Sequence, residues 1–84
     1  MTDFEYEIMD EIYFVISFEE LHKKLESEES ELKKSLGSLL EKGYIKCFLN
    51  VSDELPNEQI DFENNYRNYH YLASKEGLFA HNSK

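Results

Sequence analysis

The sequence predicts one small α+β domain, in which three helices are followed by an antiparallel pair of strands. Its 84 residues are enough for a single domain. Hydrophobic residues make up 40% of the chain and aromatic residues 14%, which is sufficient for one core. At Gly43 the spacing of apolar residues changes from about 3.6 to about 2 residues. This change places the helices before Gly43 and the strands after it.

The first two helices follow from signals at their N-termini. Thr2 and Glu5 fit a capping box, and apolar residues then recur every four positions, which predicts a helix over about residues 3–14. Ser17 begins a second capping box and predicts a short helix over about residues 18–25. The short apolar stretch between the two helices is expected to be a bridge and no more.

A third amphipathic helix, which contains Leu32, Leu36, Leu39 and Leu40, is predicted to end at Gly43. Its leucines fall on one face, and glycine is the residue that most often ends a helix in the left-handed conformation. The residues expected in the core are Ile8, Ile12, Leu21, Leu25, Leu32, Leu36, Leu39 and Ile45.

Two strands and a long loop are predicted in the second half of the chain. Residues 44–50 are rich in aromatic and branched side chains, and residues 66–73 form the return strand of a hairpin. The intervening residues 51–65 contain the only proline and exceed the usual length of a hairpin loop. Loops of this length are typically functional or disordered. Residues 74–80 are expected to add a short helical turn.

Two stretches of the sequence resemble the winged helix-turn-helix family. The two-helix unit of bacterial transcriptional regulators of the multidrug-resistance and arsenic-repressor type is similar to LHKKLESEESELKKSLGSLLEKGYI, at residues 21–45. The segment that closes the wing in such proteins resembles YLASKEG, at residues 71–77. The resemblance implies one winged-helix domain over residues 1–84, with the helix-turn-helix unit at about 18–43 and the wing at about 44–73.

The resemblance also implies one possible activity. In such domains the N-terminal part of the third helix contacts DNA bases and phosphates. A dimeric, sequence-specific DNA-binding transcriptional regulator is therefore one interpretation. Under it, the residues that would contact DNA are Ser30, Lys33, Lys34, Ser38 and Arg67.

The charge balance argues against a nucleic-acid partner. The chain has 9 Lys and Arg residues against 18 Asp and Glu residues, a net charge of −9. The expected DNA-contacting helix opens with Glu28, Glu29 and Glu31. These acids stabilise the helix dipole, but they would also repel phosphate. Nucleic acid is thus disfavoured on charge grounds, although it is not excluded.

Aromatic residues near the return strand favour a different partner. Tyrosine and phenylalanine are enriched at protein interfaces, although tyrosines spaced by two also line a half-buried strand face. Glycine within a helix costs about 0.5–1 kcal/mol relative to alanine, so Gly37 is either a notch for a partner or a tolerated surface glycine. The candidate protein interface is Phe62, Tyr66, Tyr69 and Gly37. The preferred function is an acidic module for protein interaction or self-association, whose partner is another protein or a second copy and whose role lies in regulation.

No enzyme, cofactor, metal or small-molecule site is predicted. The three glycines are isolated, and the three histidines and single cysteine lack the spacing of metal ligands. Cys47 is expected to be a half-buried apolar residue rather than a reactive thiol. No apolar run is long enough to cross a membrane and no signal peptide is present, so a cytoplasmic protein is predicted.

Overall fold

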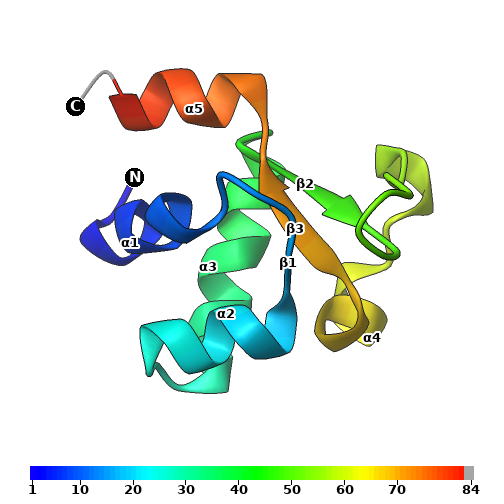
Figure 1. Ribbon diagram of the computed structural model, residues 1–84, viewed down its shortest axis with the longest axis horizontal. Coiled ribbons are helices and arrows are strands. Elements are labelled where there is room, and N and C mark those ends of the chain that lie inside the picture. The colour runs from blue at the N-terminus through cyan, green and yellow to red at the C-terminus, as the bar shows by residue number, and fades with distance from the viewer. Residues whose placement is uncertain (83–84) are drawn as a thin grey trace.

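The first and last helices of the chain pack against each other, with α1 at Asp3–Glu11 and α5 at Lys75–Asn82 (Figure 1). The computed structural model describes residues 1–82. An α+β fold is confirmed. Between the two helices the elements are β1 at Ile16–Ser17, α2 at Phe18–Leu25, α3 at Glu29–Glu41, β2 at Ile45–Phe48, α4 at Phe62–Asn65 and β3 at His70–Ala73, with 3-10 helices η1 at Asn57–Gln59 and η2 at Tyr66–Asn68.

The sheet has three antiparallel strands rather than the two that the sequence predicts. The strand order is β1-β3-β2, so the return strand β3 lies in the middle. Tyr71 occupies its centre, where it pairs with Ile16 of β1 on one side and Cys47 of β2 on the other. The prediction missed β1 because a strand of two residues shows no periodicity and pairs with a segment at the opposite end of the chain.

Helices α1 and α2 begin at the predicted caps, but α1 ends earlier than predicted. Thr2 and Glu5 form the expected capping box, and the Ser17 hydroxyl accepts a hydrogen bond from the backbone N–H of Glu20. However, α1 ends at Glu11 instead of continuing to residue 14. The reason is that the carbonyl of Ile12 accepts a hydrogen bond from the N–H of Ala73, at 2.9 Å, which directs the chain into β1.

The core forms where helices α1, α2 and α3 meet the sheet. Seven of the eight predicted core residues are buried, whereas Leu25 is only partly buried against the others. The side chains of Tyr71 and Cys47 are fully buried between the sheet and the helices. The predicted apolar faces of the helices are therefore confirmed.

The segment after β2 is more helical than the sequence predicts. Residues 66–68 form η2 instead of the start of a strand, and β3 begins only at His70. The expected 51–65 loop contains both η1 and α4. A four-residue helix such as α4 is too short to produce an apolar repeat in the sequence. Its position follows from packing against α3, which is described below.

The C-terminal helix is longer than the predicted turn and is held by Ser74. The Ser74 hydroxyl donates to the carbonyl of Gly43 at 2.6 Å and accepts from the N–H of Gly77 at 3.0 Å. It thus caps α5 and joins it to the end of α3. A side chain at Gly77 would overlap the carbonyl oxygen of Tyr44, so glycine is what allows α5 to approach this closely.

Candidate functional site

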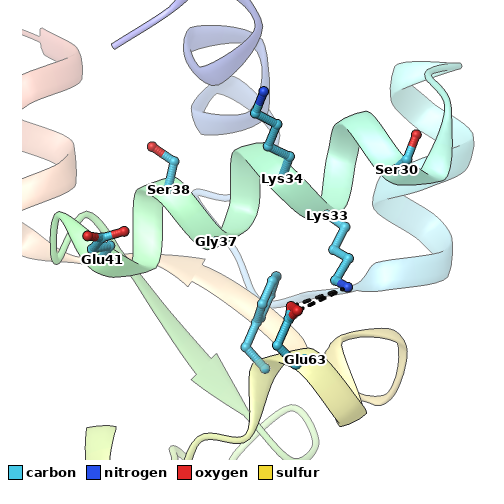
Figure 2. Close-up of a pocket in the computed structure, with 8 residues that line it drawn as sticks. Ser30, Lys33, Lys34, Gly37, Ser38, Glu41 and Glu63 are labelled. Carbon is cyan, nitrogen blue, oxygen red and sulfur yellow. Dashed lines mark hydrogen bonds and ion pairs between the residues drawn. The ribbon is translucent and has the colours of Figure 1, made fainter.

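A groove of about 570 Å³ runs along α3 beside α4 (Figure 2). We call it the α3–α4 groove. Four of the five predicted DNA contacts line it, together with Gly37 and Phe62 from the predicted protein interface. The two sets of candidates therefore share one surface. The lining residues are Ser30, Lys33, Lys34, Gly37, Ser38, Glu41, Phe62 and Glu63.

Gly37 makes room for a side chain of the same chain. A Cβ atom at this position would lie 3.3 Å from Cε2 of Phe62. In Figure 2 the Gly37 turn of α3 lies directly above α4, the short helix that also carries Glu63. The notch expected for a partner is thus already filled on this side by Phe62, which is partly buried. The open part of the groove lies beside this contact.

Tyr66 contacts side chains of α2 and α3 and so anchors residues 62–68 to these two helices. Its ring meets the ring of Phe18 edge to face, with the centroids 5.2 Å apart. The ammonium of Lys33 lies 4.9 Å from the centroid of the Tyr66 ring, a distance suited to cation–π attraction. The Tyr66 hydroxyl donates to Glu29 at 2.5 Å. Tyr66 therefore serves mainly as an internal anchor.

Glu29 is the second anchor, in the first turn of α3. Its carboxylate accepts hydrogen bonds from both the Tyr66 hydroxyl and the Arg67 guanidinium. The hydrogen bond from Tyr66, followed by the bond and charge of Arg67, lowers the pKa of Glu29 despite some opposing desolvation. Arg67, a predicted DNA contact, is consequently paired within the chain.

Most cations of the described chain are paired in the same way. Lys33 lies 3.2 Å from the carboxylate of Glu63, as the dashed lines in Figure 2 show. Among the Lys and Arg residues within residues 1–82, Lys34 and Lys75 alone have no ion pair. Lys34 is therefore the single unpaired cation of the α3–α4 groove.

Tyr69 is not available to a partner, in contrast to the prediction. It is 4% exposed, and its hydroxyl accepts a hydrogen bond from the backbone N–H of Asp61 at 2.9 Å. Tyr69 is thus a core residue that holds the beginning of α4. The sequence did contain this alternative, because Tyr69 and Tyr71 share one face of the predicted strand.

Sequence reasoning missed a buried carboxylate, Glu5, which is only 2% exposed. Burial acts to raise its pKa, but hydrogen bonds from the Thr2 backbone, the Ser38 side chain and Lys42 outweigh burial, so the pKa of Glu5 is lowered. The Lys42 ammonium lies 3.4 Å from this carboxylate. The capping box was the visible signal. A capping box does not show that α3 covers this turn of α1.

A second, smaller hollow of about 340 Å³ lies on the other side of α3. Lys34 and Ser38 belong to both hollows and form the ridge between them. The remaining lining residues are Thr2, Phe4, Glu5, Glu31 and Ser35. The exposed face of α3 is therefore a ridge of small and charged side chains with an aromatic residue on each flank.

Comparisons with models of protein families, with characterised proteins and with solved structures found no match.

Within residues 1–82, no three His, Cys, Asp or Glu side chains are grouped so that they could hold a metal ion. In the same part of the chain, no helix is both long and apolar enough to cross a membrane. Burial raises the pKa of the Cys47 thiol to about 12, which suppresses the thiolate form. The α3–α4 groove offers charges, hydroxyls and an aromatic ring for non-covalent contact.

Proposed function

We propose that the chain is a non-enzymatic winged-helix module that binds another protein chain, either a partner or a second copy, through the α3–α4 groove. One observation carries this proposal. The cations that would have to bind phosphate are paired with acids of the same chain, Lys33 with Glu63 and Arg67 with Glu29. A surface with only Lys34 left unpaired is better suited to a protein than to DNA.

The winged-helix part of the proposal is supported by the order of elements. Three helices precede an antiparallel pair, β2 and β3, as the resemblance in residues 21–45 and 71–77 implies. Strand β1, inserted between α1 and α2, adds a third strand beside β3. Because one fold serves many functions, the fold alone does not decide between protein and DNA.

Electrostatic repulsion between this surface and DNA does not depend on the strength of the ion pairs. Exposed ion pairs contribute only about 0–1 kcal/mol, so DNA could displace them at little cost. The displaced carboxylates of Glu29 and Glu63 would nevertheless stay beside the phosphates. Glu28 and Glu31 at the same end of α3 are exposed and would add to the repulsion. The net field therefore opposes binding even after the pairs are broken.

Fluorescence anisotropy with a labelled random duplex tests this argument. At roughly 50 and 200 mM salt we expect binding weaker than the ~10⁻⁴ to 10⁻⁶ M of non-specific DNA binders. The control is the triple variant Glu28→Gln, Glu31→Gln and Glu63→Gln, which removes exposed acids and should bind DNA more tightly than the natural chain. Micromolar binding by the natural chain that weakens steeply with salt would contradict the proposal.

Peptide ligands test the protein-binding half directly. Peptides selected by display against the immobilised chain would be mapped by amide chemical shifts. We expect the shifts to cluster at residues 30–41 and 62–63 and binding to weaken in Lys34→Glu. The matched control is Lys75→Glu, because Lys75 is also unpaired but lies on α5. Ligands that map elsewhere would show that the groove is not the binding site, and ligands that bind Lys34→Glu unchanged would show that Lys34 does not contact them.

A further inference from the structure

We propose that the occupant of the α3–α4 groove is a second copy of this chain, whose α3 helix lies antiparallel to the first. This inference rests on the proposed function and specifies its partner. The two-fold axis of the pair passes between Gly37 and Ser38. Such an interface is isologous, so each contact between two different residues occurs twice.

The position of this two-fold axis follows from two charged residues of α3 that have no ion pair. Lys34 and Glu41 both line the groove, both are exposed, and neither has an ion pair within the described chain. They are seven residues apart, which is about two helical turns, so they project from nearly the same face. The midpoint between them falls between Gly37 and Ser38. In an antiparallel pair about that midpoint, Lys34 of each copy lies opposite Glu41 of the other.

Most other charges on and beside α3 already have a partner within the chain. Glu29, Lys33 and Lys42 are already bound within the chain, to Arg67, Glu63 and Glu5 respectively. Glu31 also has no ion pair within residues 1–82, but it lines the second hollow and not the groove, so it lies on the other side of Lys34 from the groove. Lys34 and Glu41 are thus the two charges of the groove without an ion pair. They have opposite signs and lie at equal distances along the helix from the two-fold axis.

The shape and apolar content of the groove agree with a helix as occupant. Ser30 and Ser38 are small, and small side chains allow two helix backbones to approach, whereas the space at Gly37 is taken by Phe62 of the same chain. The partly buried Phe62 supplies apolar surface on one wall. This contribution is needed because exposed ion pairs add little affinity by themselves. The net charge of −9 on each copy opposes association, so the pairing is expected to be weak and concentration-dependent.

Charge-swap variants followed by sedimentation velocity over a wide concentration range test the pairing. Lys34→Glu and Glu41→Lys should each weaken dimerisation by about tenfold or more, because each replaces two attractive contacts by two repulsive ones. The double variant Lys34→Glu/Glu41→Lys should dimerise like the natural chain. An equimolar mixture of the two single variants should also form dimers, since both contacts become attractive in the mixed pair.

Two controls distinguish this pairing from a general effect of charge and from unfolding. Lys75→Glu, with the same change of charge, should leave dimerisation unchanged, and circular dichroism should show that every variant is folded. The inference is wrong if the natural chain stays monomeric up to its solubility limit, or if it dimerises but the mixture shows no recovery. In either case, selected peptides that map to the groove would still support the proposed function, whereas peptides that map elsewhere would refute both.

Discussion

The hydroxyl of Tyr66 donates a hydrogen bond of 2.5 Å to the carboxylate of Glu29. This contact fastens η2 to the first turn of α3 across 37 positions of sequence. It therefore fixes the wall of the α3–α4 groove. Residues that the sequence presented as a possible interface thus contribute first to the stability of the domain.

Replacing Phe62 by alanine should lower the thermal midpoint. The ring is partly buried against Gly37, so its loss should cost about 1–3 kcal/mol, less than the loss of a fully buried aromatic side chain. Replacing Phe62 and Tyr66 together should cost more. The control is Phe14→Ala, because Phe14 is 85% exposed and should be nearly neutral. An unchanged midpoint for the double variant would mean that both rings are free for a partner.

Replacing Leu36 by alanine should destabilise the chain by about 2–5 kcal/mol, as judged by chemical denaturation. The side chain is fully buried, so its removal leaves a cavity in the core. Leu49→Ala is the matched control, since Leu49 is 56% exposed and should change stability by less than about 0.5 kcal/mol. Equal effects of the two substitutions would contradict the amphipathic assignment of α3.

Two glycines should respond to alanine for different reasons. At Gly77 the new Cβ would overlap the carbonyl oxygen of Tyr44 and lie 2.9 Å from Cε of Met9, so we expect a loss of about 3 kcal/mol or more. At Gly43 there is open space, but φ is +78°, so the loss should be about 1–2 kcal/mol. Thermal denaturation of both variants compares them. A milder effect at Gly77 than at Gly43 would argue against the close approach of α5.

The stability of the chain should depend on Glu5 at acidic pH. The folded state lowers the pKa of Glu5 below its ordinary value of 4.5, so the ionised carboxylate adds stability above that pH. This contribution is lost as the pH falls from 4.5 through the lowered pKa. Glu5→Gln should be about 1 kcal/mol less stable at pH 7 and should lose less stability over the acidic range. Parallel pH profiles for the two proteins would rule out this role.

The Cys47 thiol should be almost inert in the folded protein. Burial raises its pKa to about 12, and the sulfur is also shielded from reagents. A disulfide reagent at pH 8 should therefore modify it slowly in buffer and rapidly in denaturant. Fast modification of the folded chain would show that the sheet opens readily around β2.

The parts of the fold that the sequence predicted correctly are those with a repeating pattern. The apolar faces of α1 and α3 recur over several turns, and their buried residues were identified individually. β1 and α4 were missed because they have two and four residues, and their conformation depends on partners distant in sequence. Propensity and periodicity carry no information about such partners.

The sequence predicted which residues belong to the candidate site, but not how they contact one another. The sequence singled out Lys33, Lys34, Gly37 and Phe62, and all four line the α3–α4 groove. It could not show that Phe62 fills the space at Gly37, or that Glu63 neutralises Lys33, because these contacts form only when α4 folds onto α3. The burial of Glu5 escaped prediction for the same reason.

The position of β3 at the centre of the sheet has a consequence for how the domain forms during synthesis. Its neighbour β1 is synthesised early, yet Ile16 can pair only after Tyr71 has been synthesised. The hydrogen bond between Asp10 and His81 likewise forms only after His81 has been synthesised. Local helices form within about a microsecond, whereas contacts between distant parts of a chain are slow to close. The nascent helices therefore expose their apolar faces until the last strand arrives. Docking of β3 and α5, rather than helix formation, is expected to set the folding rate.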